Sequence, residues 1–294
     1  MKILFTGASS FTGYWIVKEL VASGHQVTAV FQHPMEKYSG LRKTRVDALK
    51  EIAEPVFACP FGSDAFLQVI QTGGFDLLCH HASFVVNYKS MEFDYNYALK
   101  NNTHNIEEVM KAFVGSGGQK VILTGTVFEP GEGGGETAMY PYGLSKGLTW
   151  QVFSYYCRLY NLELAKFVVP APFGVYEKEG LASYLMKSWM RKEVPVIKTP
   201  EYVRDHIPVE LLARSYSYLI EQNLSRMAPK GFSESVGDFT KRLSQHLDMP
   251  CEYVLNEQTE FSEPKVRVNT DTLTMPWDEK SFWKRYTEYY QETR

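Results

Sequence analysis

KILFTGASSFTG, residues 2–13, joins a short apolar segment to a turn that has glycine near its start and at its end, Gly7 and Gly13. Residues 2–6 have the apolar character of a buried strand, and residues 12–22 place apolar side chains on one face of a helix. A glycine turn between a strand and a helix is the setting in which such a motif indicates dinucleotide binding. Gly7 permits the tight turn, Gly13 permits close packing of helix on strand, and the helix N-terminus offers N–H groups to a pyrophosphate.

The middle of this turn departs from the usual glycine pattern, because Ser10 stands where the spacing calls for a third glycine. Its side chain narrows the approach to a phosphate, although its hydroxyl can also donate a hydrogen bond. A turn of the same kind in a fold without a cofactor is the competing interpretation. We predict that a dinucleotide contacts Gly7, Ser10, Phe11, Thr12 and Gly13.

Alternating strands and helices extend through the first 170 residues. Strands are predicted at residues 25–31, 55–58, 75–80, 120–124 and 163–169, and helices at 64–71, 92–114 and 140–160. Strands that are hydrophobic nearly throughout and alternate with helices indicate a parallel sheet buried on both faces. The fold class is therefore α/β, with a Rossmann-like, doubly wound parallel sheet over residues 1–170.

A change of pattern after residue 170 indicates a second, smaller unit. Prolines become frequent, and the predicted elements are a strand at 194–197 and helices at 181–192, 208–221, 235–247 and 279–292. We predict an α/β substrate-binding lobe over residues 171–294, and the chain can interleave between the two units. Such a lobe would close a cleft at the carboxyl ends of the strands, where open α/β sheets bind ligands. The glycine-rich stretch 131–136 is predicted to be a mobile loop.

Composition argues against several classes of protein. A net charge of −3 without a dense Lys/Arg run gives no footprint for nucleic acid, and no apolar segment reaches the roughly 18 residues of a membrane span. The four cysteines are scattered, so we interpret them as reduced, mostly buried thiols and expect a cytoplasmic protein. His80 and His81 adjoin at a strand end, but no third ligand lies at a useful spacing, and no metal site is predicted.

Tyr142 and Lys146 are the candidate catalytic pair. They are four residues apart on a predicted helix, so their side chains can lie beside each other on one face. A fixed cation next to a phenol favours the phenolate and lowers the pKa of the tyrosine, which makes it a better acid or base near neutral pH. Taken alone, this spacing also fits an amphipathic helix with a surface lysine.

Six segments in a fixed order relate the chain to a family. They are TGASSFTG (6–13), HHAS (80–83), TGTVF (124–128), YGLSK (142–146), PFGVY (172–176) and RDHIPV (204–209). In these segments the chain resembles the extended short-chain dehydrogenase/reductases, and within them the NAD(P)-dependent epimerase/dehydratase/ketoreductase group that acts on nucleotide sugars. The resemblance spans nearly the whole chain.

This resemblance implies a catalytic triad of Thr124, Tyr142 and Lys146. Tyr142 would be the general acid/base, and Lys146 would lower its pKa and hydrogen-bond the nicotinamide ribose. Thr124 would hydrogen-bond the sugar oxygen as carbonyl and hydroxyl interconvert. A strand-end threonine that satisfies a backbone group is the alternative for Thr124, and Thr126 replaces it if the strand register differs by two.

Further contacts follow from the same resemblance. The residues expected along the cofactor are His81, Ala82, Ser83 and Pro172, and those expected on the substrate are Thr126, Phe173 and Arg204. Arg204 would pair with the substrate diphosphate, a task suited to its planar fork of donors. The arginine and asparagine that usually flank the proline are replaced by Ala171 and Gly174. A homodimer through the helices at 92–114 and 142–160 is also implied.

The residues after Thr124 bear on the type of reaction. A dehydratase of this group carries an acidic pair there, whereas this chain has Gly125 and Thr126, which disfavours elimination of water. What remains is hydride transfer at a ring carbon of a nucleotide sugar, by a 4-ketoreductase or a 4-epimerase. The length of 294 residues favours the ketoreductase, because epimerases of this group tend to be longer.

The end of the second strand bears on the choice between NADP and NAD. NAD-specific members usually carry an acid there that accepts from the adenosine ribose hydroxyls, and this chain has Gln32 and His33 instead. A 2′-phosphate would meet no repulsion, and the nearby basic residues are His33, Lys37, Arg42, Lys43 and Arg45. We therefore favour NADP over NAD. Cys59 also replaces the aspartate that usually contacts adenine.

Two other functions remain open. One is a non-catalytic, dinucleotide-binding regulator, which the unusual Ser10, Phe31 and Cys59 support and the intact Tyr142/Lys146 pair opposes. The other is a reductase of small ketones, which has no diphosphate to bind and would therefore not need Arg204.

Overall fold

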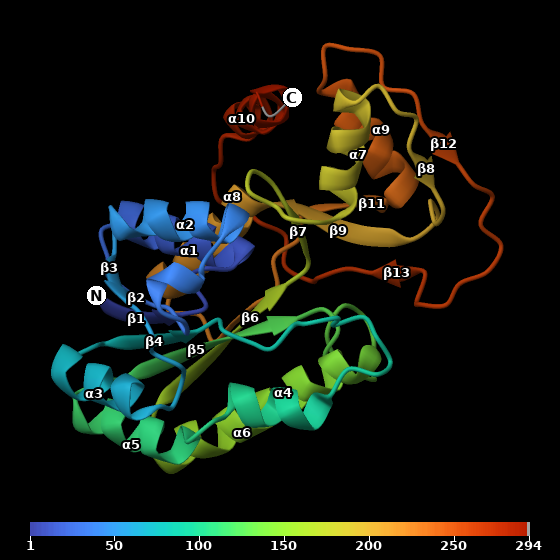
Figure 1. Cartoon of the computed structure of the whole chain (residues 1–294). Coiled ribbons are helices and arrows are strands. Elements are labelled where there is room, and N and C mark those ends of the chain that lie inside the picture. Colours follow the sequence, from blue (N-terminus) through green and yellow to red (C-terminus); the bar gives the residue numbers. More distant parts are fainter. Residues whose placement is uncertain (293–294) are drawn as a thin grey trace.

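A parallel sheet of seven strands forms the centre of the molecule in the computed structural model, which describes residues 1–292 (Figure 1). In spatial order the strands are β10 (Arg226–Met227), β6 (Glu163–Val169), β5 (Lys120–Thr126), β4 (Leu77–His80), β1 (Lys2–Thr6), β2 (Gln26–Val30) and β3 (Glu54–Val56). Every neighbouring pair is parallel. From β1 the chain first adds β2 and β3 on one side, and then β4, β5 and β6 on the other side. The carboxyl ends of β1 and β4 therefore lie side by side at the switch point, where such sheets bind ligands.

Helices cover both faces of this sheet (Figure 1). One face carries α1 (Phe11–Ala22), α2 (Gly40–Lys50) and α8 (Val209–Glu221); the other carries α3 (Asp64–Gly73), α4 (Tyr95–Asn102), α5 (Ile106–Gly115) and α6 (Tyr140–Leu159). The strands alternate their side chains between two hydrophobic clusters, so that Ile3 and Phe5 pack toward α1 and α8 while Leu4 packs toward α3 and α5. This two-sided burial explains why the strands are apolar nearly throughout.

The second unit is built around a small mixed sheet. Its strands are β7 (Ala171–Phe173), β9 (Val203–Pro208), β11 (Phe232–Ser235) and β13 (Val266–Arg267), and a separate pair consists of β8 (Val196–Ile197) and β12 (Val254–Leu255). The helices of this unit are α7 (Leu181–Met190), α9 (Val236–Gln245) and α10 (Glu279–Glu292). An aromatic core centred on Phe173, Phe282 and Tyr286 fills the space between them.

The chain passes between the two units more than once. After β9 it returns to the first unit, where α8 packs on α1 and β10 joins the edge of the large sheet, and then it enters β11. A buried asparagine, Asn269, joins the units directly: its backbone N–H donates to Asp205 of β9, and its side-chain amide donates to the carbonyl oxygens of Val168 in β6 and of Pro229, both at 3.0 Å.

One expected helix is wrong and one helix was not predicted. The single helix expected at 92–114 is two helices, α4 and α5, because Asn105 adopts a left-handed conformation with φ 52° and its side chain donates to the carbonyl of Gly62. Asparagine tolerates this conformation better than most residues. The helix α2 was not predicted. A short 3-10 turn (Met35–Lys37) lies between β2 and α2.

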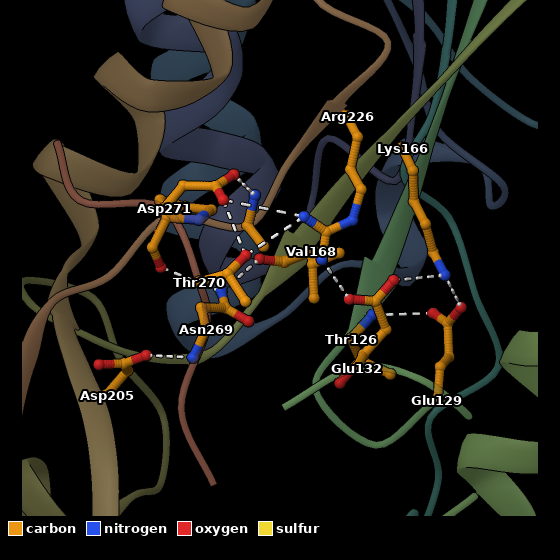
Figure 2. A network of polar contacts seen from close by, with 12 residues as sticks. Thr126, Glu129, Glu132, Lys166, Val168, Asp205, Arg226, Asn269, Thr270 and Asp271 are labelled. Carbon is orange, nitrogen blue, oxygen red and sulfur yellow. Dashed lines mark hydrogen bonds and ion pairs between the residues drawn. The ribbon is translucent and has the colours of Figure 1, made fainter. Parts of the chain in front are cut away.

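The glycine-rich stretch at 131–136, which was expected to be a mobile loop, is held by ion pairs and a backbone hydrogen bond. Glu132 is buried and its carboxylate pairs with Lys166 of β6 at 3.0 Å and with Arg226 of β10 at 2.7 Å (Figure 2). The N–H of Gly131 also donates to the carbonyl of Gly135. These contacts connect the loop after β5 to the edge of the large sheet.

Candidate active site

A cavity of about 1400 Å³ lies between the large sheet and the second unit. It is lined by the glycine turn, the carboxyl ends of β2, β4 and β5, the first turns of α6, and residues of β7 and β9. A single small-molecule site is usually roughly 300–1,000 Å³. This cavity therefore has room for a cofactor and a substrate together.

The glycine turn has the geometry that the sequence predicts. Gly7 has φ +78°, and a Cβ added to it would lie 2.7 Å from the backbone nitrogen of Ala82. A Cβ on Gly13 would lie 2.3 Å from the carbonyl oxygen of Gly7, so α1 approaches the turn as closely as only glycine allows. Ser10 caps α1 by accepting the N–H of Gly13 at 3.0 Å. The N–H groups of Phe11 and Thr12 are then the ones that α1 offers to a phosphate.

Tyr142, Lys146 and Thr124 all line the cavity. α6 carries Tyr142 and Lys146, and β5 carries Thr124 at its carboxyl end. Lys146 Nζ donates to the backbone carbonyl of Thr124 at 2.7 Å, so the helix and the strand are held together by the lysine. The helix starts close to the loop after β5, because a Cβ on Gly143 would lie 2.0 Å from the carbonyl oxygen of Phe128.

The pKa of Tyr142 differs from the expectation. Burial raises it above its ordinary value, and the carboxylate of Glu129 and the phenol of Tyr88 raise it further. The expectation that Lys146 lowers the pKa of Tyr142 is therefore not met in this structure. Lys146 is itself buried, which lowers its pKa to about 8, and its ammonium group is engaged by the Thr124 carbonyl. The phenol is thus held protonated at neutral pH, in the form that can donate a proton.

The two histidines after β4 are held by threonines. His80 Nδ1 lies 3.1 Å from Thr6 Oγ1, and His81 lies between two hydroxyls, with Nε2 2.9 Å from Thr12 and Nδ1 2.9 Å from Thr124. Burial, together with the nearby charge of Lys146, lowers the pKa of each to about 3, so both rings are neutral. In residues 1–292, no three His, Cys, Asp or Glu side chains are grouped so as to hold a metal ion.

Of the basic residues considered for binding a 2′-phosphate, some line the cavity and others are engaged elsewhere. Gln32, His33 and Arg42 line the cavity, beside Tyr38 and Cys59. Lys43 pairs with Asp47 on the surface at 2.5 Å. Arg45 is buried and donates to the carbonyl oxygens of Ser9, at 3.0 Å, and of Tyr176, at 2.8 Å. Because Ser9 belongs to the glycine turn, Arg45 stabilises that turn and is not available to a ligand. Arg42 and His33 are thus the cavity-lining members of the set.

The opposite end of the cavity is cationic. Arg204 pairs with Glu263 at 3.0 Å, and Arg267 approaches the same carboxylate at 3.4 Å. Lys89, from the loop after β4, also lines this region, and the electrostatic influence of Glu263 reaches its ammonium group. Two arginines therefore pair with one carboxylate, and Lys89 lies within its electrostatic influence. Sequence reasoning found Arg204 but missed the other residues, because Lys89 and Glu263 lie in irregular segments and Arg267 in the two-residue strand β13, none of which carries a motif.

The carboxylate of Glu129 is buried next to Gly125, near the carboxyl end of β5. Glu129 accepts the N–H of Thr126 at 2.8 Å and pairs with Lys166 Nζ at 2.6 Å (Figure 2). A Cβ on Gly125 would lie 2.7 Å from Glu129 Oε1 and 2.9 Å from Lys166 Cε. Residue 125 must therefore be small because this ion pair occupies the space of a side chain. Glu129 lies outside the cavity lining, and Lys166 neutralises its charge.

The structure brings nearly all of the predicted site residues together. Those that line the cavity are Gly7, Ser10, Phe11, Thr12, Gln32, His33, His81, Ala82, Ser83, Thr124, Thr126, Tyr142, Lys146, Pro172, Phe173 and Arg204. Gly13 lies beneath the turn, where it has a packing role. Asn102 was missed: it is buried, its amide donates to Ser83 at 3.2 Å and its carbonyl accepts the N–H of Phe84, so it orders the segment that follows β4.

Three solved structures with a similar architecture are named as epimerases. UDP-glucuronic acid 4-epimerase from Bacillus cereus, solved with UDP-glucuronic acid and NAD, is 15% identical and matches over 100% of both chains with a TM-score of 0.79. UDP-glucose 4-epimerase from Thermotoga maritima, solved with UDP-glucose, is 18% identical over 100% of this chain and 99% of that one, with a TM-score of 0.73. The ADP-L-glycero-D-manno-heptose-6-epimerase of Helicobacter pylori is 18% identical over 98% and 96%, with a TM-score of 0.72.

A comparison with curated protein sequences gives no significant match. Within residues 1–292, none of the helices is long and apolar enough to cross a membrane. The family model described as the NAD dependent epimerase/dehydratase family matches residues 3–231, which include the glycine turn, β5, α6 and β9. The chain belongs to the NAD-dependent epimerase/dehydratase family.

Proposed function

We propose that this protein is an NADPH-dependent 4-ketoreductase of a nucleotide-linked sugar. NADPH would lie along the glycine turn, with Phe11 and Thr12 at its phosphates and Pro172 near the nicotinamide, and when bound it would supply the hydride. Tyr142 donates the proton to the sugar oxygen, Lys146 holds the strand end and the nicotinamide ribose, and Thr124 hydrogen-bonds the same sugar oxygen.

The observation that carries this proposal is the single cavity shared by the glycine turn, the Thr124/Tyr142/Lys146 group and the cationic end. Proton transfer by a side chain requires the acid within hydrogen-bond reach of the reacting atom, which a shared cavity provides. The protonated state of Tyr142 suits reduction, because a ketone needs a proton as it accepts hydride.

The charges at the cationic end support a diphosphate-bearing substrate. Lys89, Arg204 and Arg267 face one carboxylate, Glu263, so this end carries an excess of positive charge at neutral pH. The guanidinium of Arg204 is already paired with Glu263 at 3.0 Å and donates to three backbone carbonyls. A diphosphate would thus meet Lys89 and Arg267 as well as Arg204. A small-ketone reductase has no use for this arrangement.

A 4-epimerase is the second candidate, and the solved relatives favour it. Two of the structures compared above are named 4-epimerases, and this chain matches one of them over its whole length, so length does not separate the two reactions. An epimerase oxidises and then reduces the same carbon and keeps its cofactor. The exposed apolar side chains of Tyr97 on α4, and of Tyr155 and Leu159 on α6, support the proposed homodimer through these helices for either reaction.

Cofactor consumption separates the two candidates. With a 4-keto-6-deoxy sugar nucleotide, we expect the protein to oxidise one NADPH for each sugar reduced, measured by nicotinamide absorbance and by chromatography of the sugar. With UDP-glucose or UDP-glucuronic acid and added NAD, a 4-epimerase would instead interconvert the C4 epimers with no net change in cofactor. Absence of NADPH oxidation with the keto-sugars of all four common nucleotides would refute the reductase assignment.

The Arg42 side chain provides a test of the cofactor. Arg42→Ala is expected to raise the KM for NADPH about 10-fold, as the loss of one charge-assisted hydrogen bond to a 2′-phosphate predicts, and to leave the KM for NADH unchanged. Lys43→Ala is the matched control, because the adjacent Lys43 is engaged with Asp47 on the surface. Equal changes for the two cofactors, or a wild-type preference for NADH, would contradict the proposed use of NADPH.

A further inference from the structure

One histidine connects the glycine turn to the catalytic threonine. His81 directly follows β4, and its ring lies between Thr12 of α1 and Thr124 of β5, with both nitrogen-to-oxygen distances at 2.9 Å. The ring of His81 also packs on Phe5 of the hydrophobic core, with the ring centroids 5.5 Å apart, and this contact restricts its orientation. A single imidazole thus links the first turn of α1 to the carboxyl ends of the neighbouring strands β4 and β5.

A neutral imidazole has one N–H donor and one acceptor nitrogen. The ring of His81 is neutral at physiological pH, as its lowered pKa requires. The two threonine hydroxyls therefore cannot both donate to the ring, nor can both accept from it. The direction of one hydrogen bond fixes the direction of the other, so the hydroxyl of Thr12 determines what the hydroxyl of Thr124 can do.

We propose that His81 is a positioning residue that keeps the hydroxyl proton of Thr124 available to the substrate. In this arrangement Thr12 Oγ1–H donates to Nε2, and Nδ1–H donates to Thr124 Oγ1. The inference rests on the proposed reduction of a sugar ketone.

The reason lies in what a carbonyl oxygen can accept. A ketone oxygen has lone pairs and no proton, so Thr124 assists only by donating its single hydroxyl proton to it. If the ring were protonated on Nε2 instead, Thr124 would donate its hydroxyl proton to Nδ1, and only its oxygen lone pairs would face the ketone. With Nδ1–H as the donor, the Thr124 oxygen is satisfied by the ring and its proton points elsewhere. Hydrogen bonds in such a chain also polarise one another, which makes Thr124 a better donor.

The tautomer can be measured without any substrate. In protein labelled with ¹⁵N-histidine, long-range ¹H–¹⁵N spectra distinguish the two tautomers of each ring, and the His81 signals are assigned by their loss in His81→Leu. We expect His81 to carry its proton on Nδ1, the form that free histidine disfavours. Thr12→Val removes the donor to Nε2, and we expect it to shift the ring toward the Nε2–H form, whereas Thr12→Ser keeps the Nδ1–H form. A wild-type ring protonated on Nε2 would overturn the inference.

Amide side chains of different length test the same point kinetically. In His81→Asn the amide nitrogen lies at the place of Nδ1 and can still donate to Thr124, whereas in His81→Gln it lies at the place of Nε2 and reaches Thr12. We expect the Asn variant to keep kcat within about 3-fold, and the Gln and Leu variants to lose about 10- to 100-fold in kcat, below the loss for removing a whole oxyanion donor. Equal losses in Asn and Gln would indicate a merely structural role.

A double-mutant cycle establishes whether His81 acts through Thr124. In a Thr124→Val background, His81→Leu is expected to cause no further loss of kcat, because the hydroxyl that it positions is already gone. Additive losses would contradict the inference. If the wild-type protein reduces no keto-sugar, the proposed function fails, and the tautomer spectra still decide the direction of the hydrogen bonds by themselves.

Discussion

Tyr142→Phe is expected to lower kcat for sugar reduction about 10²- to 10⁴-fold, the usual contribution of a positioned general acid. The change removes one hydroxyl from a buried ring that lies in edge contact with Tyr88 and Phe93, so the fold and the cofactor site should be preserved. Because burial and Glu129 raise the pKa of Tyr142, the phenol should stay protonated at and well above neutral pH. The wild-type rate of reduction should therefore first fall near pH 8, where Lys146 loses its proton, and fall again only in strongly alkaline solution.

The measurement for this variant is kcat with NADPH and a keto-sugar, with cofactor affinity determined separately from protein fluorescence. Tyr156→Phe, a hydroxyl removal on the same helix in a half-buried position away from the cavity, is the control and should leave kcat unchanged. Unchanged turnover in Tyr142→Phe, with the cofactor still bound, would favour a non-catalytic binding protein instead.

Lys166→Met is expected to cost about 3–5 kcal/mol of unfolding free energy, as does the removal of one partner from a buried ion pair. Lys166 is buried between Glu129 and Glu132 at 2.6 and 3.0 Å. Without it, Glu129 keeps only the N–H of Thr126, and Glu132 keeps Arg226. Urea unfolding followed by circular dichroism gives the free energy.

The matched control is Lys111→Met. Lys111 also pairs with two glutamates, Glu107 and Glu108, but on the exposed surface of α5, where solvent screens the charges and little change in stability is expected. Adding Glu129→Gln and Glu132→Gln to Lys166→Met should restore part of the loss, because no carboxylate then remains buried without a cation. A Lys166→Met protein as stable as the wild type would show that the buried cluster carries no net stability.

The large sheet could be predicted because its signals are local. Each strand is a short apolar run, most of the helices show a periodic apolar face, and the glycine turn has a conformation that only its residue types allow. The break at Asn105 was missed because it depends on a contact between Asn105 and Gly62, two residues far apart in sequence. An α/β character of the second unit was predicted, but the strands of its mixed sheet were missed for the same reason: β13 has two residues, and its partner Val203 lies some sixty positions earlier.

The sequence names the residues that we propose to be catalytic, and they line one cavity, but it does not reveal their electrostatics. The spacing of Tyr142 and Lys146 correctly places both in one cavity, yet the sign of the pKa shift of Tyr142 depends on burial and on Glu129, which no spacing reveals. Gly125 is the clearest example. In the sequence it indicates a missing acid, whereas in the structure it is the space that a buried Glu129–Lys166 pair requires.

Asn269 has a consequence for the motions of the protein. Its backbone and side chain bond to β9 of the second sheet and to β6 of the large sheet, and the neighbouring Asp271 accepts the N–H of Ala228 at 2.6 Å (Figure 2). A hinge between the two units at this point would have to break buried hydrogen bonds, which is costly. We therefore expect the opening between Tyr142 and Arg204 to be set when the chain folds, with ligands entering a cleft of fixed width rather than drawing two domains together.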